Sequence, residues 1–196
     1  MAVAAYIAVG SNIHPETNIP AALDKLMRFV RVTASSTFYR TAPLSAPGTP
    51  AGKGARATGG NVGATSRGDP EFLNGVWRIE TGLDARALKF TVLRRIEEEL
   101  GRTRGTNRYA PRTIDLDLLI YGSMAINEPD LRVPDPDIRS RPFLAVPLLQ
   151  LAPDLVLADN GERLADVCHG GPRPCAGEAL MPDREITEQL NERIKP

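Results

Sequence analysis

Cysteine is scarce in this sequence, and its scarcity excludes one class of small protein. The two cysteines, Cys168 and Cys175, both lie late in the 196 residues. Two cysteines cannot make the disulfide framework on which small secreted domains depend. With His169 they offer three ligands where a structural zinc site needs four. We therefore expect a cytoplasmic protein that is stabilised by its apolar core. A chain of this length can bury such a core without disulfides or a structural metal.

Net charge and long hydrophobic runs are lacking as well. The 24 Lys and Arg residues balance 24 Asp and Glu residues, so the formal net charge is zero. Because proteins that bind nucleic acids usually carry a basic excess, we expect no nucleic-acid partner. No apolar run approaches the roughly 18 residues of a membrane span, and the apolar start has no basic leader. We therefore expect neither membrane contact nor a signal peptide.

Lysine is the scarce cation, with four residues against twenty arginines. Codon bias would explain this imbalance. A demand for planar groups that bind phosphate through two parallel hydrogen bonds would also explain it. Composition leaves both explanations open, so the positions of the arginines matter more than their number.

The apolar pattern predicts an alternation of strands and helices. The predicted strands cover residues 3–9, 32–39, 72–80 and 113–121. The predicted helices cover residues 18–30 and 84–100, with Asn18 and Asp84 as N-caps. This order is that of a ferredoxin-like βαββαβ fold of the α+β class, in which an antiparallel sheet carries both helices on one face.

We expect one domain, residues 1–168, followed by a C-terminal extension, residues 169–196. An extra hairpin at 125–133, an apolar helix at 143–151 and a last amphipathic helix with Ile186, Leu190 and Ile194 add to the basic fold. Residues 43–70 are dense in Gly, Pro, Ser, Thr and Ala and have no apolar period, so we expect a long mobile loop there. Such loops often act as lids. We expect a monomer.

The residues that indicate chemistry begin with an Asp-x-Asp pair in the last predicted strand. Because strand side chains alternate, Asp115 and Asp117 share one face. Thr113, Leu119 and Tyr121 are expected on that face too, and the opposite, helix-covered face is expected to hold Ile114, Leu116, Leu118 and Ile120. Two neighbouring carboxylates raise each other's pKa, and Mg²⁺ would compensate them. The alternative is two solvated acids on an exposed face.

Four arginines precede this pair with no acidic residue among them, namely Arg102, Arg104, Arg108 and Arg112. A carboxylate pair beside an arginine-rich loop suits phosphoryl transfer, with metal on one side of the phosphates and guanidinium groups on the other. Surface pairing with Glu97, Glu98 and Glu99 is the alternative. The segment Gly48–Gly54 has the wrong glycine spacing for a phosphate-binding Walker A loop. Phosphate binding would therefore rely on arginine and metal.

The run from Arg108 to Leu119, with its Pro-Arg-Thr-Ile-Asp-Leu-Asp core, resembles the signature of the 6-hydroxymethyl-7,8-dihydropterin pyrophosphokinases of folate synthesis. Residues 5–12, 38–44, 72–74 and 147–155 resemble other anchors of this family in the same order. The resemblance covers about residues 3–168. It implies that a diphosphate moves from the co-substrate ATP to the hydroxymethyl group of a reduced pterin, with release of AMP.

The resemblance also implies roles for single residues. Two Mg²⁺ ions would bind Asp115 and Asp117, which with Arg102 and Arg112 form the implied catalytic set. The implied ATP contacts are Glu97, Arg104, Arg112 and Arg141. The implied pterin contacts are Thr41, Pro43, Leu44, Phe72, Asn74, Tyr109 and Phe143, with the two phenylalanines on either side of the ring.

The sequence departs from the family pattern in three places. Asp135 stands in Val133–Pro136 where the family usually has His, the 43–70 loop is long, and the tail after His169 has no family counterpart. These departures leave open a weakened paralogue that acts as a pterin- or nucleotide-binding regulatory module. A ferredoxin-like RNA-binding domain is a second alternative, because fold does not determine function, although zero net charge argues against it.

Overall fold

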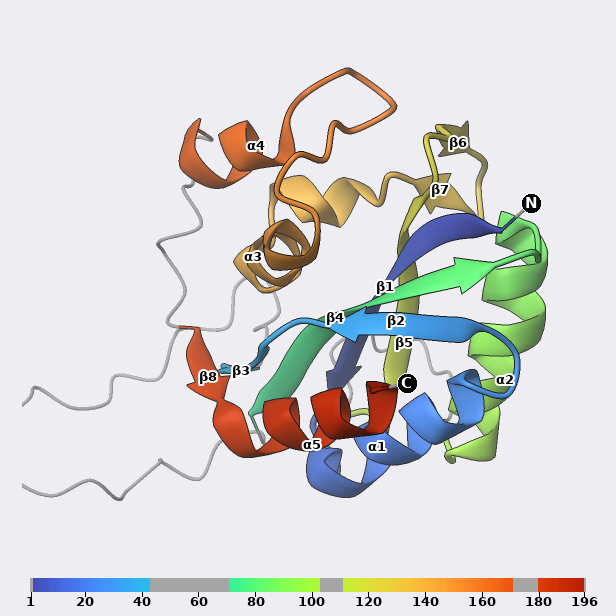
Figure 1. The fold of residues 1–196 in the computed structure, drawn as a ribbon, viewed down its shortest axis with the longest axis vertical. Coiled ribbons are helices and arrows are strands. Elements are labelled where there is room, and N and C mark those ends of the chain that lie inside the picture. The colour runs from blue at the N-terminus through green and yellow to red at the C-terminus, as the bar shows by residue number, and fades with distance from the viewer. Residues whose placement is uncertain (1, 43–70, 103–110, 171–179, 196) are drawn as a thin grey trace, which may run out of the picture.

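A computed structural model describes residues 2–42, 71–102, 111–170 and 180–195. Its centre is a six-stranded antiparallel sheet in the order β5–β1–β4–β3–β8, with β2 also paired to β4 (Figure 1). The sheet strands are β1 (Val3–Ser11), β2 (Arg31–Ser35), β3 (Phe38–Thr41), β4 (Phe72–Thr81), β5 (Asp115–Tyr121) and β8 (Met181–Asp183). The short strands β6 (Ile126–Asn127) and β7 (Arg132–Val133) form the separate hairpin that was predicted.

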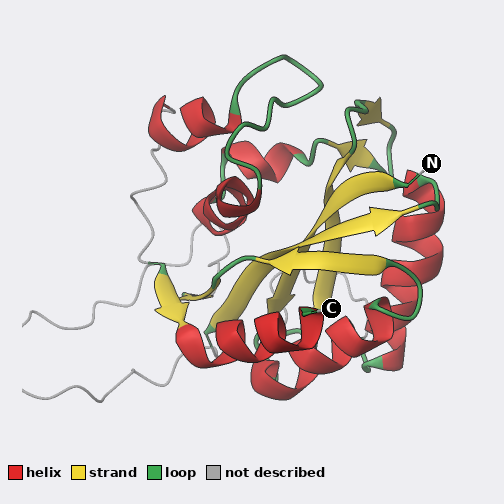
Figure 2. Cartoon of the chain, in the orientation of Figure 1, coloured by secondary structure: helices red, strands yellow, loops and turns green. Residues whose placement is uncertain are grey.

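Helices cover both faces of the sheet (Figure 2). One face carries α1 (Pro15–Leu26), α2 (Arg94–Glu99) and α5 (Arg184–Ile194), and the other carries α3 (Pro142–Leu151) and α4 (Leu164–Gly170). The predicted antiparallel α+β fold is confirmed, with α1 and α2 on one face as expected. A π-helical segment, Ala87–Leu93, precedes α2, and a 3₁₀ turn, Pro136–Arg139, precedes α3. Within the described ranges, no helix is long and apolar enough to span a membrane.

Two apolar clusters lie on the two faces of the sheet. The larger one packs α1, α2 and α5 on side chains such as Ile7, Trp77 and Leu116, while the smaller one packs α3 and α4 on Tyr6 and Val76. Burial of these faces is the main force that holds the layers together. Helix α3 lies over only part of its face (Figure 1). Beside it, the end of β1 and the starts of β4 and β5 line a pocket.

The C-terminal residues that were predicted as an extension contain two elements of this architecture. Strand β8 pairs with β3, and α5 buries Ile186 and Leu190 in the larger cluster. Arg40 of β3 forms ion pairs with Asp183 and Glu16, and the backbone N–H of Phe38 donates to the Thr187 hydroxyl (3.0 Å). Residues 180–195 are thus attached to the strand that leads into the site.

The first predicted helix and the second predicted strand had wrong bounds, and the helix ends at Leu26 rather than at residue 30. The first helix begins at Pro15 rather than after Asn18, whose side chain instead donates to the Ile13 carbonyl (2.6 Å). The predicted strand 32–39 is two strands, because pairing with β4 is interrupted after Ser35, where the Ser36 hydroxyl accepts from the Val76 N–H. At Asn18 a local side-chain bond to the backbone competes with the regular pattern. At Ser36 the competing side-chain bond reaches across to β4.

The strand alternation predicted for β5 was right up to Leu119 and wrong for Ile120 and Tyr121. Tyr6 pairs with Ile120 and Ile7 with Leu118, so Leu119 is an extra, unpaired residue. Such a β-bulge reverses the alternation after it. Ile120 therefore packs in the smaller cluster beside Leu119, and Tyr121 in the larger one, the opposite of the predicted placement of both. The bulge follows the aspartate pair and leaves its orientation unchanged.

Candidate active site

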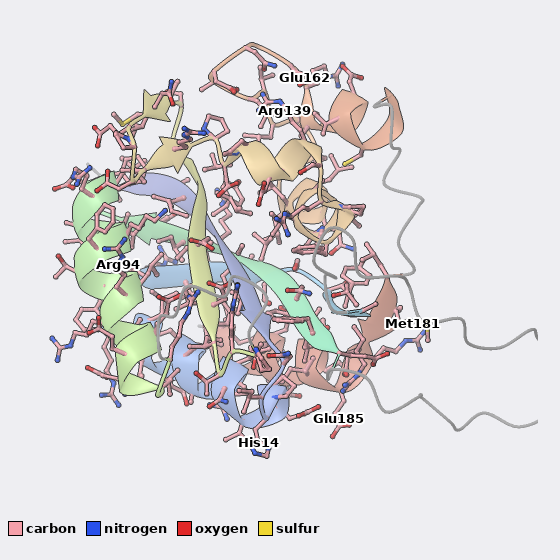
Figure 3. The ribbon with its side chains drawn as sticks, turned by 180° about the vertical axis from the view of Figure 1, so that it is seen from behind. His14, Arg94, Arg139, Glu162, Met181 and Glu185 are labelled. Carbon is pink, nitrogen blue, oxygen red and sulfur yellow. The ribbon has the colours of Figure 1, made fainter. Side chains whose placement is uncertain are left out.

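A pocket of about 270 Å³ opens on the sheet face beside α3. Its walls come from segments far apart in the sequence: β1, the end of β3, the start of β4, β5, and the turn before α3. The lining residues are Ala8, Val9, Gly10, Thr41, Ala42, Phe72, Asn74, Arg112, Asp115, Asp117, Leu119, Asp135, Asp137, Arg141, Phe143 and Leu144. Figure 3 views the molecule from the side opposite to Figure 1 and shows β5 in front of the sheet.

The carboxylate pair of β5 lies in a network of charged side chains. The Asp115 carboxylate accepts hydrogen bonds from the guanidinium groups of Arg102 and Arg112. Arg102 also donates to Glu97, whose side chain is 1% exposed. The same Glu97 oxygen, Oε1, accepts from the backbone N–H of Leu116 (2.9 Å). Buried ionic groups require such partners, so this network holds Asp115 in a defined orientation.

Asp117 has a different environment, with fewer cationic partners. Its side chain is half exposed to the pocket, and among the described residues its ion-pair partner is the Lys89 ammonium, 3.9 Å from Oδ1. Loss of bulk water around the carboxylate and the neighbouring charge of Asp115 raise the pKa of Asp117 to about 6, although Lys89 and Arg102 oppose this shift. Within the described part of the chain, the site thus has negative charge that its cations do not fully compensate.

Across β1 from the carboxylates lies a second polar group. Gly10 of β1 pairs with Asn74 on one side and Asp115 on the other. Because neighbouring strands are about 4.8 Å apart, the two groups are separated by about 10 Å. Asn74 is buried and donates to the Thr41 hydroxyl (2.8 Å), which directs its carbonyl oxygen towards Gly10. Phe72, two residues earlier on β4, adds an aromatic ring to this side of the pocket.

The opposite wall is the turn that leads into α3. Asp135 caps this turn by accepting a hydrogen bond from the Asp137 N–H (2.8 Å), and burial raises the pKa of Asp135. The Asp137 carboxylate forms an ion pair with Arg141, with 2.8 Å between Oδ2 and Nε. The same guanidinium lies 5.7 Å from the Phe143 ring centre. The wall therefore presents an oriented cation and an aromatic ring to the pocket.

The turn before α3 is itself tied to the segment that follows α3. Arg139 forms ion pairs with Asp159 (2.8 Å) and Glu162 (3.1 Å), and Figure 3 shows Arg139 and Glu162 next to each other. These pairs are partly exposed and contribute little stability individually. Their effect is to fix the position of the turn that carries Asp135 and Asp137.

The structure brings together most of the described residues that were predicted for the site. Eight of them line the pocket, namely Thr41, Phe72, Asn74, Arg112, Asp115, Asp117, Arg141 and Phe143. Glu97 and Arg102 do not line it and lie behind Asp115 instead. Glu97 was predicted as an ATP contact, but in this structure its carboxylate is buried and bound to Arg102 and Leu116. Pro43, Leu44, Arg104 and Tyr109, and with them the 43–70 loop, lie outside the described residues.

Sequence reasoning missed the residues that anchor Arg112. The family resemblance covers residues 5–12 but assigns no role to Ser11 or Asn12. Asn12 accepts a hydrogen bond from the Arg112 N–H (2.6 Å) and donates its own N–H to the Arg112 carbonyl (3.1 Å), while the Ser11 hydroxyl donates to the Thr113 carbonyl (2.6 Å). Lys89 and Asp137 were also missed. Lys89 meets Asp117 only through contacts across the fold. Asp137 lies four residues before Arg141, a spacing that could have indicated their ion pair.

The carboxylates of Asp115 and Asp117 suit a divalent cation that also binds the substrate. Within the described ranges, no group of three or more His, Cys, Asp or Glu residues is arranged to hold a metal alone. Mg²⁺ commonly binds through one or two carboxylates and completes its coordination with water and substrate phosphates. Asp117, with its incompletely compensated charge, and Asp115 beside it match that pattern of ligands.

Comparisons with known proteins agree with this geometry. Residues 6–153 match the model of the 7,8-dihydro-6-hydroxymethylpterin-pyrophosphokinase family. Two relatives carry the name 2-amino-4-hydroxy-6-hydroxymethyldihydropteridine pyrophosphokinase. The Haemophilus influenzae protein is 34% identical over 161 residues, 81% of this chain and 87% of the relative. The Pseudomonas aeruginosa protein is 37% identical over 158 residues, 79% of this chain and 84% of the relative.

Solved structures show the same fold. The wild-type HPPK-DHPS of Plasmodium falciparum matches 85% of this chain with a TM-score of 0.59 and 13% sequence identity. This chain spans 44% of that longer protein, so the likeness concerns the fold of one part of it. With the family model covering residues 6–153 and two relatives above 30% identity, the chain belongs to the 7,8-dihydro-6-hydroxymethylpterin-pyrophosphokinase family.

Proposed function

We propose that this chain transfers a diphosphate from ATP to the hydroxymethyl group of 6-hydroxymethyl-7,8-dihydropterin and releases AMP. The proposal depends on one observation: strand β1 runs between two groups of side chains that line the same pocket. The Asp115–Asp117 pair and Arg112 lie on one side, and Asn74, Thr41 and Phe72 on the other. Such a pocket holds a phosphate chain and a flat heterocycle next to each other, as transfer between them requires.

Asp115 and Asp117 would hold Mg²⁺ on the phosphate side. When bound, the metal neutralises charge on the phosphates and helps to orient them. Arg112 already faces the pocket beside Asp115, and its planar guanidinium suits two parallel hydrogen bonds to a phosphate. Arg102 acts from behind by fixing Asp115, and Arg141 adds a cation on the opposite wall. Charge neutralisation and positioning therefore account for the rate, without a covalent intermediate.

The pterin side selects a flat ring with hydrogen-bonding edges. The Asn74 side chain is positioned by Thr41 and can bond the edge of the ring. Phe72 and Phe143 lie on walls of the same pocket and would pack against the ring faces.

The test is the identity of the spent nucleotide. The protein is incubated with MgATP and 6-hydroxymethyl-7,8-dihydropterin, and the products are separated by chromatography. We expect one AMP and one pterin diphosphate for each ATP consumed. Release of ADP would contradict diphosphate transfer, and tight binding of both ligands without turnover would favour the regulatory module instead.

Replacing Gly10 with alanine is expected to raise the pterin KM by about tenfold or more, because small displacements of a positioning group are costly. The added Cβ would lie 2.7 Å from Asn74 Oδ1 and displace that side chain. Steady-state kinetics with each substrate varied in turn would measure this effect. Gly82→Ala is the matched control, since a Cβ there meets no atom within 4 Å. An unchanged pterin KM would contradict the placement of the pterin beside Asn74.

Divalent-cation binding is expected to weaken as the pH falls through about 6. The pKa of Asp117 is raised to about 6, so below this pH the carboxyl takes up a proton and no longer attracts a cation. Because a ligand must be deprotonated to bind, affinity at pH 5 should be about tenfold lower than at pH 8. Titration with Mn²⁺, followed by the EPR signal of the free ion, measures this without a nucleotide. A flat profile between pH 5 and 8 would contradict the assignment.

A further inference from the structure

An unusual helical segment approaches the carboxylate pair from the far side of the sheet. Residues Ala87–Leu93 form a π-helix that continues directly into α2. Two guanidinium groups contact the Phe90 ring in this segment, Arg86 at 4.9 Å and Arg94 at 4.1 Å from its centre. Figure 3 shows Arg94 on this helix beside β5. Segments of π-helix are rare in proteins, and those that occur often lie at functional sites.

The π-helical segment carries Lys89 to the site. Its neighbours Leu88 and Val92 are buried in the larger cluster, on the face of the sheet opposite the pocket. Strand β5 is the edge strand, so a long side chain can pass that edge and reach the pocket face. The Lys89 ammonium lies 3.9 Å from Asp117 Oδ1, and its side chain is 19% exposed.

The two aspartates therefore differ in how their charge is balanced. Asp115 accepts hydrogen bonds from two guanidinium groups. In the part of the chain that the structure describes, Lys89 is the cation within ion-pair distance of Asp117. At 3.9 Å this contact is longer than a hydrogen bond, so its effect is electrostatic rather than a fixed geometric link. The ammonium also reduces the effect of burial on Asp135.

We propose that Lys89 serves as the counter-ion of Asp117 and moderates the affinity of the site for a divalent cation. The proposal rests on the metal role of Asp117 in the proposed function. A positive charge about 4 Å from a ligand carboxylate stabilises that carboxylate when no metal is bound and repels a metal that arrives. A moderated affinity would favour release of the metal once a transfer is complete.

The first test uses Mn²⁺ alone, with the free ion followed by EPR. We expect Lys89→Met to bind Mn²⁺ about three- to tenfold more tightly than wild type, because a repelling charge is removed. Lys89→Arg should behave like wild type. The matched control is Lys25→Met, which removes an equal charge from an ion pair with Glu99 outside the pocket, and should leave Mn²⁺ affinity unchanged.

The sign of the change separates the proposal from a packing role. Loss of packing would weaken Mn²⁺ binding or leave it unaffected, and either result in Lys89→Met would overturn the proposal. Equal Mn²⁺ affinity of wild type and Asp117→Asn would instead contradict the metal role of Asp117, so the two failures are distinguishable. In kinetics, we expect Lys89→Met to lower the Mg²⁺ concentration that gives half-maximal rate and to reduce kcat.

A second test needs neither metal nor turnover. Urea unfolding of the metal-free protein is compared for wild type, Lys89→Met, Asp117→Asn and the double variant, which forms a double-mutant cycle. We expect Lys89→Met to lower the unfolding midpoint when Asp117 is present and to have a smaller effect when Asn replaces it. Equal effects in both backgrounds would show that Lys89 does not act through Asp117 and would overturn the proposal.

Discussion

Asp117→Asn is expected to lower the rate of diphosphate transfer by about a thousandfold, a loss typical of removing one group that stabilises charge in a transition state. The substitution keeps the shape of the side chain and removes the charge that would attract the metal. The fold should survive, because Asp117 lines the pocket and belongs to neither apolar cluster. This variant has the largest effect on activity that the structure predicts.

The same variant should leave the metal-free protein as stable as wild type, or more stable, at neutral pH. The pKa of Asp117 is raised to about 6 in the folded protein, above its ordinary value of 3.8. A raised carboxyl pKa means that the ionised form opposes folding, and this penalty is largest above pH 6. Asparagine removes the penalty. Loss of activity with gain of stability is a frequent signature of a functional site.

Activity and the urea unfolding midpoint measure these two effects together. Asp24→Asn is the control, because Asp24 is an exposed residue of α1 that pairs with Arg193 of α5 and does not line the pocket. It should change neither the rate nor the midpoint appreciably. Near-normal turnover of Asp117→Asn would contradict the metal role of this residue, and the proposed mechanism with it.

Glu97→Ala is expected to have the largest effect on stability, lowering the free energy of unfolding by about 3–5 kcal/mol. The Glu97 carboxylate is almost fully buried and accepts from both Arg102 and the Leu116 N–H. Its removal leaves the Arg102 guanidinium, whose side chain is 13% exposed, with less negative charge beside it. It also removes the side-chain acceptor of the Leu116 N–H. Diphosphate transfer should fall as well, because Asp115 loses part of its support.

Urea unfolding followed by circular dichroism measures the change in stability. Glu99→Ala is the matched control two residues away, since the exposed Glu99 pairs with Lys25 and Arg95 on the surface. Its unfolding midpoint should stay close to that of wild type, as is usual for exposed ion pairs. A Glu97→Ala variant as stable as wild type would show that the buried network is not needed for folding.

Much of this protein could be predicted before its structure was considered. The order of strands and helices and the antiparallel sheet followed from apolar periodicity. The Asp115–Asp117 pair on one strand face followed from period-two alternation, and the Pro-Arg-Thr-Ile-Asp-Leu-Asp core indicated the family. These features depend on residues close together in the chain, where side-chain direction is set by the local backbone.

Contacts between distant segments decided the rest. The bulge at Leu119 depends on how β5 pairs with β1, and the place of α5 depends on a gap in the larger cluster that Ile186 and Leu190 fill. The balance of charge at Asp117 depends on a lysine 28 positions earlier, brought close by a π-helical turn and an edge strand. Local patterns specify which way a side chain points along its own element. Which charge or surface it meets there is determined by packing between elements, because that is where burial makes unpaired groups costly.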